Sequence, residues 1–160
     1  MGYKKMNVSE YIFNYLYSKG IDTVFILVGG GSMYLNDAVA KSKMKVICCH
    51  HEQACAYAAV GYSKYTNKPC VVLITSGCGG TNCITGLLDA YQDSVPVIFI
   101  SGQVNNEDIN YNSNECFGIQ SVNINPIIKS FQCFVDLKDV EKIKKPIWLD
   151  VPLNIQKEDI

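Results

Sequence analysis

The stretch TVFILV at residues 23–28, followed by GGGS at residues 29–32, decides the fold. A continuous apolar run of this length is typical of a strand buried on both faces, because helices pack against each face of such a strand. The glycines that follow indicate a tight turn where the strand ends. The sequence therefore predicts a buried strand that leads directly into a glycine turn.

The same alternation continues along the chain. Helix one begins with the capping-box pattern Asn7-Val8-Ser9-Glu10 and ends at Gly20. Further strands are predicted at Val46–Cys49, Cys70–Thr75, Val97–Ile100 and Ile147–Val151, and helices at residues 8–19, 33–42, 52–65 and 81–91. Apolar strands that alternate with helices favour a parallel sheet with right-handed crossovers. We therefore predict an α/β protein, a three-layer αβα sandwich with a central, mostly parallel sheet, in which residues 1–160 form a single domain.

The region before the last strand is less regular. Residues 104–120 are polar and follow neither the helical nor the strand period, so we predict one long loop there. After this loop we expect a short strand within Ile127–Val135 and a short helix over Leu137–Lys145.

Composition excludes several classes of function. With 160 residues and 48% apolar content, the chain can bury the core of one globular domain. The 14 basic and 15 acidic residues give a net charge of −1 without a basic stripe, so no nucleic-acid partner is expected. No stretch of about 18 apolar residues could span a bilayer, and no signal peptide is recognisable. We expect a cytoplasmic protein that does not enter a membrane.

Eight cysteines raise the alternative of a metal site, with CCHHE at residues 48–52 as the densest cluster. Neighbouring residues of an extended segment point to opposite faces, whereas zinc ligands must converge. The cysteines also form no C-x-x-C pair. We therefore interpret most of them as small buried residues in a reducing compartment and predict no metal ligands on this chain.

Three polar or glycine-rich segments follow predicted strands, at Gly29–Ser32, His50–Gln53 and Ser76–Asn82. Ligands of open parallel sheets bind at the carboxyl ends of the strands, so these segments should meet at one edge. Neither Gly-x-G-x-x-Gly nor the phosphate-loop pattern Gly-x-x-x-x-Gly-Lys-Ser/Thr is present, which disfavours a general nucleotide site.

A series of motifs carries a resemblance to a known family. The motifs are GGGS (29–32), HHEQA (50–54), TSGCGGTN (75–82), DSVP (93–96), GQV (102–104), FGIQ (117–120), PIIK (126–129) and WLDVP (148–152). Their order and spacing resemble the aminopyrimidine-binding (PYR) domain of acetolactate-synthase-like enzymes that use thiamine diphosphate. The resemblance covers nearly the whole chain.

The resemblance implies roles for particular residues. Glu52 would be the catalytic carboxyl group that hydrogen-bonds to N1′ of the cofactor's aminopyrimidine and so promotes loss of the thiazolium C2 proton. The residues implied in cofactor binding are Val28, Gly29, Gly30, Thr75, Ser76, Asn82 and Gln103, with Gln120 on the substrate side. The alternative for Glu52 is an ordinary acidic residue in the first turn of a helix. For His51 there are two interpretations, a structural residue at a strand end or a proton shuttle.

The sequence also departs from the family. It has no Gly-Asp-Gly motif, so Mg²⁺ and the diphosphate would need a diphosphate-binding domain in the same or another chain. Cys78 stands where the family usually has a proline in the second glycine loop. The stretch Val140–Lys145 is shorter than the helix that precedes the last strand in the family. With that partner domain, we expect transferase or lyase chemistry on a small 2-oxo acid and a homodimer through PYR domains. The alternative is a non-catalytic or split-subunit module that pairs with another chain.

Overall fold

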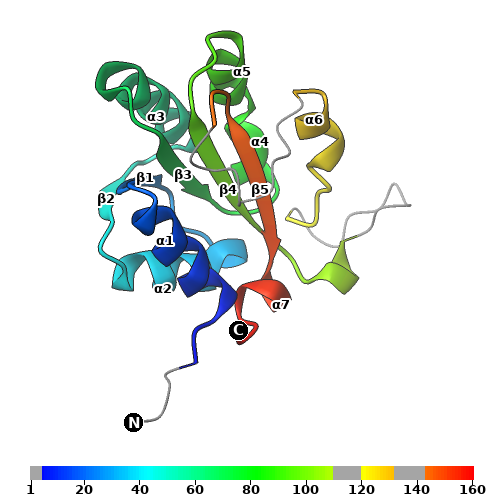
Figure 1. Ribbon diagram of the computed structural model, residues 1–160. Coiled ribbons are helices and arrows are strands. Elements are labelled where there is room, and N and C mark those ends of the chain that lie inside the picture. The colour runs from blue at the N-terminus through cyan, green and yellow to red at the C-terminus, as the bar shows by residue number, and fades with distance from the viewer. Residues whose placement is uncertain (1–4, 110–119, 132–142) are drawn as a thin grey trace.

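Five parallel strands form the centre of the protein (Figure 1). The computed structural model describes residues 5–109, 120–131 and 143–160. The strands are β1 (Thr23–Ile26), β2 (Lys45–Cys48), β3 (Cys70–Ile74), β4 (Val97–Gln103) and β5 (Ile147–Pro152). Their order in the sheet is β2-β1-β3-β4-β5, and every neighbouring pair is parallel. This arrangement confirms the predicted α/β class with a parallel central sheet.

Helices cover both faces of the sheet and complete the three layers. On one face lie α1 (Val8–Ser18) and α2 (Met33–Lys41), with α7 (Leu153–Gln156) packed against both. On the other face lie α3 (Glu52–Thr66), α5 (Ile84–Gln92) and the short helices α4 (Cys78–Asn82) and α6 (Asn125–Lys129). Two 3₁₀ turns, η1 (Gly30–Ser32) and η2 (Asn106–Asp108), follow β1 and β4.

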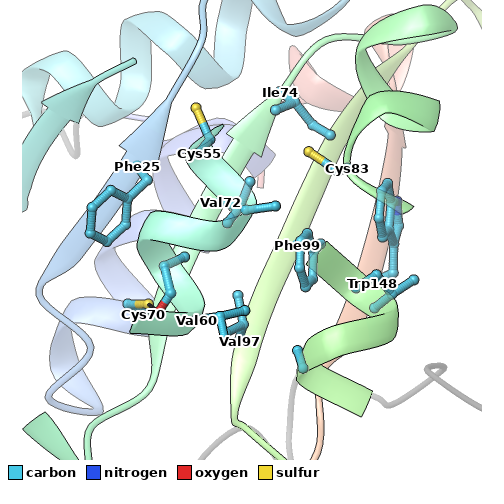
Figure 2. Packing of buried hydrophobic residues seen from close by; sticks show 14 of the residues in the cluster. Phe25, Cys55, Val60, Cys70, Val72, Ile74, Cys83, Val97, Phe99 and Trp148 are labelled. Atoms are coloured by element: carbon cyan, nitrogen blue, oxygen red, sulfur yellow. Dashed lines mark hydrogen bonds between the residues drawn. The ribbon is translucent and has the colours of Figure 1, made fainter. Parts of the chain in front are cut away.

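Alternating side chains of the strands divide the core in two. In β3, Cys70, Val72 and Ile74 join the core under α3 and α5, while Val71 and Leu73 join the core under α1 and α2. A fully buried aliphatic side chain contributes roughly 1.5–3 kcal/mol, so both cores stabilise the sheet. Figure 2 shows the first core, in which the Phe99 ring stacks on Trp148 with centroids 5.2 Å apart.

Caps fix where the helices begin and end. Asn7 Oδ1 accepts from the Glu10 amide at 2.8 Å, and the Glu10 carboxylate accepts from the Asn7 amide, which is the predicted capping box. Helix α3 begins after His51, whose Nδ1 accepts from the Gln53 amide at 3.1 Å. It ends at Asn67, which adopts the left-handed conformation with φ 54°. Within the described residues, no helix combines the length and apolarity that crossing a bilayer requires.

Three sequence predictions need correction or fall outside the described residues. The helix predicted over 81–91 is two helices, α4 and α5, with Cys83 between them. The strand predicted within Ile127–Val135 is wrong where it can be checked, because α6 runs over Asn125–Lys129 with Pro126 in its first turn, a position that proline favours. Residues 143–145 are not helical, and the rest of the helix predicted over 137–145 lies outside the described residues.

The strand predicted at Val46–Cys49 is present as β2, which lies at an edge of the sheet, and Val46 is 41% exposed. An edge strand lacks a neighbour on one side, so an apolar run alone does not place a strand in the interior.

Candidate active site at the carboxyl edge of the sheet

The sheet order places a topological switch point between β1 and β3. The chain leaves β1 toward β2 on one side and returns to β3 on the other, so the connections at the two carboxyl ends diverge. Such a crevice is where ligands bind in open parallel sheets. The two glycine segments singled out in the sequence follow these two strands.

Three glycines surround the side chain of Thr75 in this crevice. A Cβ atom added to Gly29 would lie 2.4 Å from Thr75 Cβ, and one added to Gly79 would lie 2.8 Å from Thr75 Cγ2. A Cβ on Gly31 would lie 3.0 Å from Thr75 Oγ1, to which the Gly31 amide donates a hydrogen bond at 3.0 Å. The two glycine loops therefore approach each other closely enough to exclude any side chain but hydrogen at these positions.

The glycine turn after β1 is held from within. Ser32 Oγ and Asn36 Nδ2 both donate to the Gly29 carbonyl oxygen, at 3.2 and 3.1 Å. The outer side of the turn is open: Gly30 has no atom within 4 Å of an added Cβ, and the Val28 side chain is 65% exposed. The structure thus brings Val28, Gly29 and Gly30 together as an exposed apolar rim, which a flat ring could contact.

Glu52 is the first residue of α3 and lies beside the second glycine loop. Its side chain is half-buried, and Asn82 Nδ2 from the end of α4 donates to Glu52 Oε2 at 3.0 Å. The other oxygen, Oε1, faces Gly79, where an added Cβ would lie 3.3 Å away. The structure therefore joins two residues that are 30 positions apart in sequence and were both predicted for the site.

The backbone under Glu52 is anchored to α5. Cys83 Sγ donates to the Glu52 carbonyl oxygen at 3.3 Å, and Gln53 Nε2 donates to Thr85 Oγ1 at 2.8 Å. Burial, and secondarily the Glu52 charge, raises the pKa of the Cys83 thiol, which therefore stays protonated and able to donate. These contacts fix the start of α3 relative to the second glycine loop.

Ser76 differs from its neighbours because its hydroxyl is unsatisfied. Its side chain is 3% exposed, and Oγ has no hydrogen-bond partner among the described residues. The hydroxyl lies against the glycine turn, since a Cβ on Gly31 would be 2.5 Å from it. The next residue, Gly77, has φ 62° and so needs glycine at this bend.

Gln103 is separated from this group by its own contacts. It is 1% exposed at the end of β4, and its Nε2 donates to the Val122 carbonyl oxygen and to Asp150 Oδ2, at 2.9 and 3.0 Å. Its Oε1 accepts from the Val104 amide. A role for Gln103 toward a cofactor stays a prediction. Gln120 is exposed in a turn, and residues 117–119 of its motif lie outside the described residues.

Sequence reasoning missed a polar network between β4 and β5. Asp150 Oδ1 accepts from Ser101 Oγ at 2.5 Å, and Trp148 Nε1 donates to the same hydroxyl at 2.8 Å. Burial raises the pKa of Asp150 to about 6, although the hydrogen bonds from Ser101 and Gln103 oppose the rise. The sequence did contain an indication of this network, because an acidic residue inside an apolar strand must find buried hydrogen-bond donors.

Most of the chain matches the sequence of a known protein family. Residues 6–124 match the family described as thiamine pyrophosphate enzyme, N-terminal TPP binding domain. The chain belongs to this family. The match confirms the resemblance inferred from the motifs, since thiamine pyrophosphate is thiamine diphosphate under another name.

Three relatives of this thiamine pyrophosphate-binding domain are named acetolactate synthases. The acetolactate synthase large subunit of Buchnera aphidicola (subsp. Acyrthosiphon pisum) is 36% identical over 94% of this chain and 28% of its own length. The chloroplastic acetolactate synthase of Arabidopsis thaliana is 33% identical over 88% of this chain and 23% of its own length. The Escherichia coli isozyme 2 large subunit is 44% identical over 62% of this chain and 18% of its own. The chain thus spans less than a third of these relatives.

The residues at the crevice fit the aminopyrimidine part of thiamine diphosphate. Ser76 offers a buried hydroxyl without a partner, Gly30 offers open space, and Glu52 offers a carboxylate with a single donor among the described residues. Among the described residues, no three His, Cys, Asp or Glu side chains are grouped so that they could hold a metal ion.

Proposed function

We propose that this chain binds the aminopyrimidine of thiamine diphosphate in an acetolactate-synthase-like enzyme that acts on 2-oxo acids. The observation that carries the proposal is the Glu52 carboxylate, which Asn82 holds at 3.0 Å and which lies beside Gly79 of the second glycine loop. When bound, thiamine diphosphate supplies a nucleophilic carbon at C2 and an electron sink for decarboxylation or carboligation. The diphosphate and its Mg²⁺ are bound by a diphosphate-binding domain of the same or another chain.

Each residue of the crevice has a task in this proposal. Glu52 Oε1 would hold the proton that N1′ of the aminopyrimidine needs, while Asn82 donates to Oε2 and orients the side chain. Val28, Gly29 and Gly30 contact the ring face through the exposed rim. Thr75 holds the turn by accepting from the Gly31 amide, and the buried Ser76 hydroxyl lies against the same turn.

The same domain pairs with a second copy of itself through α3. One face of this Ala-rich helix is buried in the protein's own core and carries Cys55, Ala56, Ala59 and Val60. The opposite face is exposed and consists of small and aromatic residues: Ala54, Tyr57, Ala58, Gly61 and Tyr65. Small residues permit close approach of a second helix, and the two tyrosines add apolar area.

Pairing is tested by introducing charge on that face. Ala58→Glu should shift the chain from the mass of a dimer to that of a 17.8 kDa monomer in analytical ultracentrifugation, whereas Ala40→Glu, at an exposed position of α2, should not. Equal masses for wild type and both variants would contradict pairing through α3 and leave the split-subunit alternative, in which another chain covers this helix.

The activation role is tested by Glu52→Gln in the chain joined to its diphosphate-binding domain. The amide keeps the shape and hydrogen-bonding of the side chain, so folding and cofactor binding should persist. Exchange of the thiazolium C2 proton in deuterated solvent, followed by NMR, should slow by about 10²–10⁴-fold, the usual contribution of a positioned acid or base.

A matched control separates this role from that of an ordinary helix-start acid. Glu10 also lies in the first turn of a helix, where its carboxylate belongs to the capping box of α1. Glu10→Gln should leave the exchange rate within a factor of two of wild type. If Glu52→Gln behaves like Glu10→Gln, Glu52 is only a helix-start carboxylate and the proposal fails.

A further inference from the structure

Gln156, near the carboxyl end of the chain, reaches the glycine turn after β1 through the interior. The residue lies in α7 and is 0% exposed. Its Nε2 donates two hydrogen bonds, to the Gly31 carbonyl oxygen at 2.8 Å and to the Val151 carbonyl oxygen at 2.7 Å. One amide group, 125 positions after Gly31 in sequence, therefore ties the turn to the end of β5.

The Gly31 peptide is held on three sides. Its N–H donates to Thr75 Oγ1 from β3, and its carbonyl accepts from Gln156. On the third side, Gly102 of β4 packs so closely that an added Cβ would lie 2.1 Å from the Gly31 oxygen. Gln156 is the donor that satisfies this buried carbonyl, which would otherwise face an apolar strand without a partner.

The orientation of the Gln156 amide follows from the same contacts. Its Oε1 is buried and has no partner among the described residues. Turning the amide over would place that oxygen against two carbonyl oxygens, which is less favourable than leaving it unpaired. The donor end of Gln156 is therefore fixed toward Gly31.

We propose that Gln156 is a positioning residue, which sets how far the Gly29–Gly31 turn stands out from the sheet. Nothing touches Gly30 from outside, so the depth of the rim is determined by its inner contacts. Ser32 and Asn36 hold the Gly29 carbonyl, and Gln156 holds that of Gly31. The proposal rests on the proposed function, because the rim then meets an aminopyrimidine ring.

The test measures the turn directly in the 160-residue chain. Selective ¹⁵N labelling of its 12 glycines allows hydrogen exchange of the Gly31 amide to be compared with that of Gly86, which packs in α5 against Ala56 on the other face. In Gln156→Leu, Gly31 should exchange about 10- to 100-fold faster relative to Gly86, as expected for loss of two hydrogen bonds. A change of equal size at both glycines, or none at Gly31, would overturn the proposal.

Ser9→Ala is the matched control. Ser9 Oγ donates to the Gln156 backbone oxygen at 2.9 Å, so this variant loosens the contact between α1 and α7 without removing the side-chain bond to Gly31. The ratio of exchange at Gly31 to that at Gly86 should stay within a factor of three of wild type. A ratio as high as that of Gln156→Leu would show that docking of α7, rather than the Gln156 amide, orders the turn.

Gln156→Glu keeps the test decisive if the leucine variant does not fold. A carboxylate cannot donate to Gly31, whereas a protonated carboxyl group can donate once. The exchange of Gly31 relative to Gly86 should therefore slow as the pH falls from 7 to 5 in this variant and not in wild type. A ratio in the variant that does not change with pH would overturn the proposal.

Thiamine, which carries the aminopyrimidine without the phosphates, separates this proposal from the function on which it rests. Added to the wild-type chain at millimolar concentration, it should shift the resonances of Gly29 and Gly30, and it should shift them less in Gln156→Leu. If thiamine shifts neither resonance in wild type while the exchange results are as expected, the proposed aminopyrimidine site is wrong and the role of Gln156 in the turn stands. Equal shifts in wild type and variant would overturn Gln156 as a positioning residue.

Discussion

Two acidic side chains near the carboxyl edge of the sheet differ in what surrounds them. Glu52 is half-buried and, among the described residues, receives one side-chain hydrogen bond, from Asn82. Asp150 receives hydrogen bonds from Ser101 and Gln103, one on each oxygen, and burial raises its pKa to about 6. An acid whose oxygens are both engaged by the protein serves the fold, whereas one with an oxygen left over can serve a ligand. The number of donors therefore distinguishes two acids that residue type and position do not, and it leaves an oxygen for a ligand on Glu52 alone of the two.

The largest expected effect that tests this comparison is the dependence of folding stability on pH that Asp150 causes. Its folded pKa of about 6 lies above the ordinary value of 3.8, so the folded state binds the proton more tightly than the unfolded state. Stability should therefore fall as pH rises from about 4 to about 6, by about 3 kcal/mol for this group alone.

Asp150→Asn should remove that decline. The amide oxygen can accept from Gln103, the amide nitrogen can donate to Ser101 Oγ once that hydroxyl rotates, and the amide does not ionise. Urea unfolding at pH 4, 5, 6 and 7 should give a variant whose stability relative to wild type improves with rising pH. A wild-type decline that persists in the variant would mean that another group titrates there, and the contrast with Glu52 would lose its basis.

The sequence predicted the parts of this protein that depend on local pattern. The strand and glycine turn at residues 23–32, the capping box of α1 and the start of α3 at Glu52 all follow from neighbouring residues, and the structure confirms them. The meeting of the three strand-end segments followed from the parallel sheet. That part of the site could be located because the carboxyl ends of parallel strands share an edge.

Other features could not be predicted because they depend on distant partners. Gln156 contacts Gly31 across the interior, and nothing in the sequence NIQKE indicates that one glutamine is wholly buried. The apolar residues Ile127 and Ile128 resemble a strand as easily as a helix, and Pro126 in the first turn decides for the helix. The position of β2 at the sheet edge likewise depends on topology rather than on its own residues.

The second-largest expected effect is a difference in stability between substitutions on the inner and the outer side of the glycine turn. An added Cβ on Gly102 would lie 2.1 Å from the Gly31 oxygen, so Gly102→Ala forces backbone to move and should cost roughly 1–3 kcal/mol. Gly30→Ala meets nothing within 4 Å and should change stability by about 0.5 kcal/mol or less. Thermal and urea unfolding of the two variants measure the difference. Similar costs would indicate that the turn is not packed more tightly on its inner side.

The smallest effect concerns His51, the residue immediately before Glu52. Its Nδ1 caps α3 by accepting from the Gln53 amide at 3.1 Å, and its side chain is exposed. His51→Ala should therefore cost about 0.5–2 kcal/mol of stability, typically near 1, as loss of a cap does, and His51→Asn should restore most of it because asparagine caps well. A proton shuttle behaves differently, since neither alanine nor asparagine can carry the proton. Measured in the chain joined to its diphosphate-binding domain, thiazolium C2 proton exchange that is slow in both variants would assign His51 to the chemistry. Exchange at the wild-type rate in His51→Asn, with stability restored, leaves Glu52 as the proton-transferring residue at the start of α3 and His51 as the residue that holds its helix in place.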